Sequence, residues 1–278
     1  MATTETARTV VDVPHRPDRH SPLHRALLRA LGPLTGSRLL DVGCGVGLLL
    51  RSAERRGAVV AGVDTAVERL EIARWALPDA DLRVGDATAL PFGDGVFDVV
   101  TACGVAARDT GRAALAEPVR VLAPGGRLAV GAWAHPAGCW SERFGERLRR
   151  LTIRESIPLA AAPGPEAELR DAGLPVVTAG EVDCPVVYPS LVAAWTEMLG
   201  GEQLVAAIRV AGERAVHDAF LASVSSAVGA DGTVRVSKAF RYAVAEVPSH
   251  VTACDVELNL SHIFVTMDND LASGSDSI

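Results

Sequence analysis

The chain has 278 residues, of which 49% are hydrophobic, and its formal net charge is −7. This length and hydrophobic content allow one large domain or two small ones with a substantial core. The acidic balance disfavours nucleic acid as the main partner, because phosphate binding needs clustered cationic side chains.

The first twenty residues contain no secretory apolar segment, and no stretch approaches the roughly twenty apolar residues of a membrane span. Five cysteines are scattered along the chain, and none forms a C-x-x-C pair. The seven histidines show no metal-ligand spacing. We therefore expect a cytoplasmic protein in a reducing compartment, with no membrane partner, no structural disulfide and no metal site.

The predicted elements begin after a polar segment, 1–20, with a helix that starts at Ser21 and ends before Gly32. Serine caps helices well, and the proline that follows it suits the first helical position. The sequence thus predicts an N-terminal cap segment and helix over 1–34.

Strands and helices alternate over the next hundred residues. The predicted strands are 38–42, 58–64, 82–84, 96–103 and 127–133, and the helices between them are 47–56, 65–76 and 111–122. Near-continuous apolar strands separated by helices indicate a parallel sheet that is covered on both faces. Ligands of such sheets bind beyond the carboxyl ends of the strands.

The alternation loosens after Trp133. The pattern predicts a helix near 141–152, a connection near 159–165, a further helix-strand pair, an amphipathic helix at 191–199, a helical stretch over 203–228, and a final strand pair or one long strand over 234–247. The last segment, 249–278, is a C-terminal extension that adds an edge strand or contacts a partner chain.

A glycine-rich turn, Asp41-Val42-Gly43-Cys44-Gly45-Val46-Gly47, follows the first strand. A turn without side chains lets a ligand approach the backbone N–H groups and the positive end of a helix dipole. Leu48 or Leu50 stands where a dinucleotide fingerprint needs its third glycine, so NAD and FAD are disfavoured. The Gly-Lys-Ser/Thr of a P-loop is absent. A strand-helix turn that binds nothing remains the alternative.

Five stretches, in order and spacing, resemble the class I S-adenosylmethionine (SAM)-dependent methyltransferases of the UbiE-like, or type 11, group. They are the glycine turn, Asp64 at the end of the second strand, Gly85-Asp86-Ala87 after the third, Leu90-Pro91-Phe92 with Phe97-Asp98-Val99-Val100 at the fourth, and Arg120 to Leu128 before the fifth. The resemblance covers roughly 35–248. It implies a Rossmann-like α/β fold, a doubly wound, mostly parallel seven-stranded sheet with a helical lid insertion at about 190–229.

The resemblance also implies a SAM site. Asp64 is expected to accept the ribose hydroxyls and Asp86 the adenine amine, while the bare turn leaves room for the methionine end. The alternatives are that Asp64 is an ordinary strand-ending carboxylate and that Asp41 holds the turn's amides. The expected cofactor contacts are Asp41, Gly43, Cys44, Gly45, Asp64, Thr65, Asp86, Ala87, Cys103 and Gly104.

Methyl transfer from SAM is an in-line displacement, in which the cofactor carries the chemistry and the protein orients the reactants. His135, after the fifth strand, is the first candidate general base, and Tyr188 is the weaker one. Two alternatives stay open. The transfer needs no general base, or His135 is only a loop histidine. Arg108 stands where related sequences place aromatic residues, which suggests an anionic group on the acceptor.

The leading hypothesis is methyl transfer to a small-molecule acceptor, with a specialised metabolite as the expected class. One alternative is a SAM-binding enzyme that catalyses a cyclisation or rearrangement without methylation. Another is a non-catalytic SAM-binding interaction protein, and a homodimer stays open. Trp195 and Met198 belong either to a lid over the acceptor or to the core stripe of a packed helix.

Overall fold

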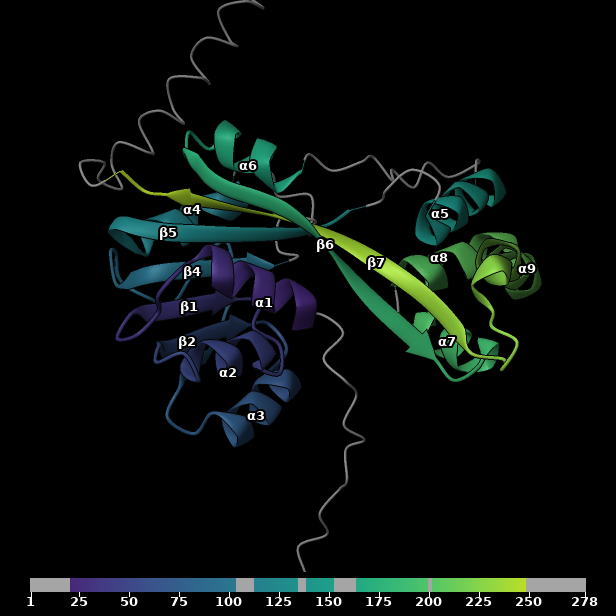
Figure 1. Ribbon diagram of the computed structural model, residues 1–278, viewed down its shortest axis with the longest axis horizontal. Coiled ribbons are helices and arrows are strands. Elements are labelled where there is room, and N and C mark those ends of the chain that lie inside the picture. The colour runs from purple at the N-terminus through teal and green to yellow at the C-terminus, as the bar shows by residue number, and fades with distance from the viewer. Residues whose placement is uncertain (1–20, 104–112, 135–138, 153–163, 200–201, 249–278) are drawn as a thin grey trace, which may run out of the picture.

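A seven-stranded sheet forms the centre of the computed structural model, which describes residues 21–103, 113–134, 139–152, 164–199 and 202–248. The strands are β1 (Arg38–Val42), β2 (Val59–Asp64), β3 (Asp81–Val84), β4 (Phe97–Cys103), β5 (Leu122–Trp133), β6 (Val176–Tyr188) and β7 (Val234–Glu246). Their order is β3-β2-β1-β4-β5-β7-β6, and β7 alone runs antiparallel to its neighbours (Figure 1). The predicted doubly wound, mostly parallel sheet is confirmed.

Helices cover both faces of this sheet. They are α1 (Ser21–Ala30), α2 (Leu48–Glu54), α3 (Val67–Ala76), α4 (Ala113–Arg120), α5 (Trp140–Leu151), α6 (Pro165–Asp171), α7 (Leu191–Met198), α8 (Glu202–Ala211) and α9 (Glu213–Val224). Helices α1, α2 and α3 lie on one face, with α4 and α6 on the other (Figure 1). Successive strand side chains point to opposite faces, so Leu39 packs toward α1–α3 and Leu40 toward α4 and α6.

The two longest strands extend past the rest of the sheet. The last residue of β5, Trp133, pairs with Phe240, whereas β7 already begins at Val234, opposite Tyr188 of β6. Helices α5, α7, α8 and α9 gather around this extension (Figure 1) and share a separate apolar core with it. We call these four helices, with 184–188 and 234–238, the helical lobe.

Two elements differ from the sequence-based expectation. Strand β5 begins at Leu122, because Leu122 pairs with Phe97 before an irregularity that contains the expected turn at 124–126. The helical stretch expected over 203–228 is broken at Gly212, whose φ of 85° does not occur within a helix. Of the two alternatives expected over 234–247, a strand pair or one long strand, the structure has one long strand, β7.

None of the helices among the described residues combines the length and the hydropathy that crossing a membrane requires.

Candidate functional site

The ends of β1, β2 and β3 lie at the same edge of the sheet. The three strands are parallel, with Val42 opposite Val63 and Asp64 opposite Val84. The glycine turn after β1, the residues that follow Asp64 and the Gly85 segment after β3 therefore emerge side by side. This is the edge at which ligands bind in open α/β sheets.

The glycine turn is held against β2. The amides of Gly43 and Cys44 both donate to the carbonyl oxygen of Val63, at 2.7 and 3.0 Å. Gly47 has a φ of 78°, and a Cβ there would lie 2.9 Å from the Leu77 side chain, so only glycine fits. No described atom lies within 4 Å of where a Cβ would stand on Gly45. The turn is thus pinned on one side and has room at Gly45.

Asp64 ties this turn to the start of α3. Its side chain is buried, with one carboxylate oxygen accepting from the Gly45 amide at 2.8 Å and the other from the Ala66 amide at 2.9 Å. A carboxylate offers about four lone-pair positions, so Asp64 retains acceptor capacity for about two more donors. Thr65, the next residue, is exposed. Asp64 therefore has a structural role and the chemistry to bind a pair of hydroxyls.

The Asp86 segment lies directly beside Asp64. The Gly85 amide donates to the Asp64 carbonyl oxygen at 3.2 Å. Asp86 is exposed, and its Oδ1 accepts from the amide and hydroxyl of Thr88 at 2.9 and 2.6 Å. Ala87 is half-buried and packs against the core under α4 and α6. Consecutive hydrogen bonds thus join Gly45, Asp64 and Gly85, within reach of one nucleoside-sized ligand.

Asp41 lies beneath the turn and is 5% exposed. Its Oδ1 accepts from the Thr101 hydroxyl at 2.6 Å, whereas the turn's amides bond to Val63 and Asp64 instead. Burial raises the pKa of Asp41 to about 6, although the Thr101 bond and the charge of His24 act in the opposite direction. A buried carboxylate at neutral pH favours a nearby cation, and an ammonium or sulfonium group would supply one.

Both cysteines expected at this site have protonated thiols at neutral pH. Burial raises the pKa of Cys44 to about 12 and also raises that of Cys103. A Cβ on Gly62 would lie 2.7 Å from the Cys44 sulfur, and one on Gly131 would lie 3.1 Å from the Cys103 sulfur. Glycine in the adjacent strand gives each thiol its space. The cysteines are therefore suited to line a site rather than to act as nucleophiles.

The candidate acceptor-side residues are only partly described. His135, Arg108 and Gly104 lie outside the described residues. Tyr188 ends β6 in the helical lobe, is 4% exposed, and donates to Glu197 at 3.4 Å. It is far along the sheet order from β1–β3. In the described ranges, no cluster of three or more His, Cys, Asp or Glu side chains is arranged to hold a metal ion.

The structure adds residues that the sequence did not single out. His24 of α1 lies close enough to Asp41 to lower the pKa of that carboxyl. The two residues are far apart in sequence, and only the docking of α1 onto the sheet brings them together. Glu117 and Arg120 of α4 likewise bond to the loop that follows Asp86. Arg120 was recognised only as part of the stretch preceding β5.

Known proteins resemble parts of this chain in sequence. A family model for a methyltransferase domain matches residues 40–130. The demethylmenaquinone methyltransferase of Renibacterium salmoninarum is 39% identical over 113 residues, which are 40% of this chain and 48% of that protein. The 27-O-demethylrifamycin SV methyltransferase of Amycolatopsis mediterranei is 35% identical over 158 residues, which are 53% of this chain and 57% of that one. The chain spans about half the length of these curated relatives.

The likeness in fold extends further than the likeness in sequence. The YcgJ protein of Bacillus subtilis superposes with a TM-score of 0.53 at 20% sequence identity, covering 81% of this chain and 97% of that chain. The glycine turn from Gly43, Asp64 and Asp86 all fall inside the family match at 40–130. The family match in sequence and the match in fold thus both include the edge at which hydrogen bonds join Gly45, Asp64 and Gly85.

Proposed function

We propose that this chain, which carries a class I SAM-dependent methyltransferase domain of the UbiE-like group, transfers a methyl group from SAM to a small-molecule acceptor. The observation that carries the proposal is the continuous run of hydrogen bonds from Gly45 through Asp64 to Gly85. It joins the three stretches that must contact one nucleoside. The names of the relatives support a small organic acceptor.

The residues at this edge match the groups of SAM in chemistry. Asp64 accepts the two ribose hydroxyls with its remaining lone pairs, and Asp86 accepts from the adenine amine while the Ala87 amide donates to a ring nitrogen. The open side of the turn at Gly45 receives the methionine end, above the buried carboxylate of Asp41. When bound, SAM supplies a methyl group on a positively charged sulfur.

The acceptor side of the proposal rests on position along the chain. His135 follows β5 at the carboxyl edge and is the proposed general base, and Arg108 is the proposed partner for an anionic group. The helical lobe lies beyond the end of β5, where a cover over the acceptor is needed. Trp195 packs within the lobe, against His217 and Phe220, which matches the packed-helix alternative for this residue, and we assign the cover to the lobe as a whole. A specialised metabolite is the proposed acceptor class.

The test is incubation with methyl-labelled SAM and demethylated quinone or phenol acceptors. Label in the product is the expected result, and Asp64→Ala should abolish it. A changed product without label would instead indicate cyclisation or rearrangement. Tight binding of S-adenosylhomocysteine with neither outcome would indicate a non-catalytic binding protein, and no binding at all would contradict the assignment of the cofactor.

A further inference from the structure

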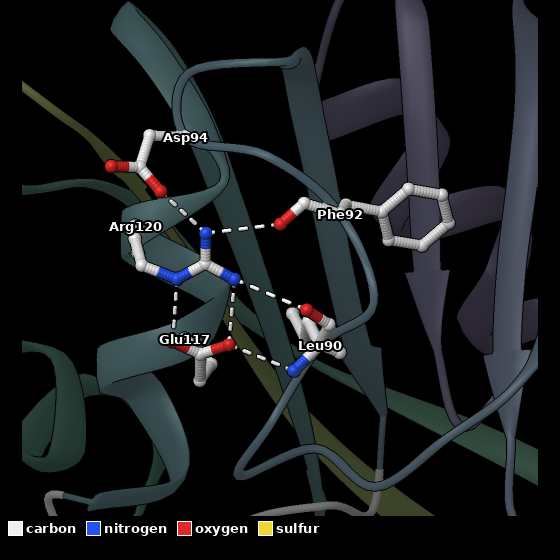
Figure 2. A network of polar contacts seen from close by, with 5 residues as sticks. All are labelled: Leu90, Phe92, Asp94, Glu117 and Arg120. Carbon is white, nitrogen blue, oxygen red and sulfur yellow. Dashed lines mark hydrogen bonds and ion pairs between the residues drawn. The ribbon is translucent and has the colours of Figure 1, made fainter.

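The loop after β3 is fastened to helix α4 by two side chains, Glu117 and Arg120 (Figure 2). Arg120 donates to the carbonyl oxygens of Phe92 and Leu90 at 3.0 and 3.2 Å, and to the Asp94 carboxylate at 2.5 Å. Glu117 accepts from the Leu90 amide at 2.7 Å. We call Glu117 and Arg120 the α4 clamp.

The clamp is itself a paired unit. The guanidinium of Arg120 meets both carboxylate oxygens of Glu117, at 2.5 and 2.7 Å, in the fork geometry that gives Arg–carboxylate pairs their directionality. The hydrogen bond from Arg120 lowers the pKa of Glu117 below its ordinary value, so the pair stays charged at neutral pH. Only 25% of the Arg120 side chain and 20% of the Glu117 side chain are exposed. The clamp is therefore more rigid than a surface ion pair.

Residues 90–94, which the α4 clamp holds, contact the segment around Asp86. A Cβ on Gly85 would lie 3.1 Å from the Pro91 ring, so Pro91 packs on the residue before Asp86. Asp86 and Ala89 form a β-bridge, which closes the intervening residues into a tight turn that ends one residue before Leu90. A shift of the clamped residues would therefore move Asp86 and Ala87 with them.

A second contact holds the same segment from β3. The Arg83 guanidinium lies 4.3 Å from the centre of the Phe92 ring and donates to the Pro91 carbonyl oxygen. Phe92 in turn packs edge-on against Phe97 at 5.0 Å. With residues 90–94 held from α4 and from β3, the projecting part of the loop is the short turn from Asp86 to Ala89.

From these contacts we propose that Glu117 and Arg120 are positioning residues for the nucleoside, which set how Asp86 and Ala87 meet the adenine and thereby the preference for adenine over other purines. The inference rests on the proposed function, since it takes SAM as the ligand. Neither side chain is among the proposed cofactor contacts, and both act through the loop residues that they bond. A clamp that only stabilised the fold would weaken binding of every nucleoside alike.

The test compares two ligands by calorimetry: S-adenosylhomocysteine, and S-inosylhomocysteine, which has a carbonyl in place of the adenine amine. We expect the native chain to prefer the adenosyl ligand about tenfold, the equivalent of one hydrogen bond. Arg120→Lys keeps the charge but loses the fork. It should weaken the adenosyl ligand about tenfold and reduce the preference to about twofold or less. Glu117→Gln should act in the same direction.

The matched control is Arg241→Lys, which makes the same substitution in another Arg–Glu pair. Arg241 of β7 donates to Glu166 of α6 at 2.8 Å, away from the Asp86 loop. This variant should leave both affinities and their ratio unchanged. If Arg120→Lys weakens both ligands equally, or lowers thermal stability without changing the ratio, the positioning role is overturned.

Amide hydrogen exchange on the unliganded chain separates this inference from the proposed function. The Thr88 and Ala89 amides donate to the side chain and carbonyl of Asp86, so their protection reports its position. Arg120→Lys should speed exchange at both amides, and Arg241→Lys should not. Unchanged exchange overturns the clamp even where SAM binds. If exchange is faster in Arg120→Lys but the chain binds neither ligand, the α4 clamp does hold the loop. In that case the proposed function, and with it the adenine preference, is contradicted.

Discussion

The carboxyl edge of β1–β3 and the helical lobe are built in opposite ways. The edge is held by polar bonds between backbone and carboxylates, as in the bond from the Gly45 amide to Asp64. The lobe is held by apolar contact, with Phe220 packed against Phe144 and Trp195 at ring separations of 6.0 and 5.4 Å. Under the proposed function, the edge is a fixed polar site for the cofactor and the lobe is an adaptable apolar cover for the acceptor.

The two regions also differ in how sequence change is expected to affect them. At the edge, a side chain such as Asp64 has directional partners, and a substitution leaves named amides unsatisfied. In the lobe, side chains that differ in shape but match in volume can be exchanged at low cost. If the proposed function holds, variation in the lobe changes the acceptor and leaves the proposed cofactor site unchanged.

The largest effect is expected from Phe220→Ala. The side chain is 1% exposed at the centre of the lobe core, and truncating a buried phenylalanine costs about 3–5 kcal/mol. Affinity for S-adenosylhomocysteine should nevertheless stay within about twofold, because the apolar cluster that contains Phe220 includes no residue of β1, β2, β3 or the glycine turn. Phe220→Leu is the control that keeps most of the volume. Denaturant unfolding and calorimetry measure the two quantities, and parallel losses in both would show that the regions are not separable.

Asp64→Ala should have the next largest effect, about a hundredfold loss of S-adenosylhomocysteine affinity, since charge-assisted hydrogen bonds contribute about 1.5–3 kcal/mol each. The matched control is Asp98→Ala. Asp98 also accepts a backbone amide, that of Arg38 at 2.8 Å, but at the amino end of the strands. It should change stability and not affinity. Equal affinities in the two variants, measured by calorimetry, would remove Asp64 from the site.

Asp41→Asn should raise stability at pH 7 by about 1–2 kcal/mol. The folded pKa of about 6 lies above the ordinary 3.8, so the folded chain binds the proton more tightly between these values. The contribution of Asp41 to stability is therefore fully present below about pH 4 and is lost as the pH rises through about 6. Urea unfolding of both chains from pH 4 to 7 measures the difference between them. A difference that does not change with pH would contradict the raised pKa.

Tyr188→Phe is expected to have the smallest effect. Its hydroxyl donates a long hydrogen bond, at 3.4 Å, to Glu197 inside the lobe, and losing such a bond costs about 0.5 kcal/mol. Turnover should fall by less than about threefold, because the structure places this hydroxyl away from the edge of β1–β3. Steady-state kinetics decide the point. A large loss of turnover at unchanged stability would contradict this expectation and support Tyr188 as the general base.

The meeting of the glycine turn, Asp64 and the Asp86 segment at one edge could be predicted because its pattern is local in sequence. Gly43 to Gly47 can form their turn only as glycine-rich backbone, and Asp64 and Asp86 each end or follow a strand whose apolar pattern is clear. In a parallel sheet, these strand ends must meet at one edge. The order of these strands in the chain is therefore enough to place Gly43–Gly47, Asp64 and Asp86 near one another.

Other features depend on packing between distant segments. The bonds from Arg120 to Leu90 and Phe92 join residues about thirty positions apart, and no periodicity reports such a pair. The break at Gly212 was hidden because apolar spacing continues through it, from α8 into α9. The separate lobe core also escaped prediction, since the same aromatic spacing fits a lid or a packed stripe equally well.

The most direct test of the central claim is the structure of this chain with S-adenosylhomocysteine bound. We expect both ribose hydroxyls within hydrogen-bonding distance of the Asp64 carboxylate, the adenine amine at Asp86, and the homocysteine end over Gly45. A ligand bound elsewhere, or one at this edge that leaves both carboxylates untouched, would contradict the account.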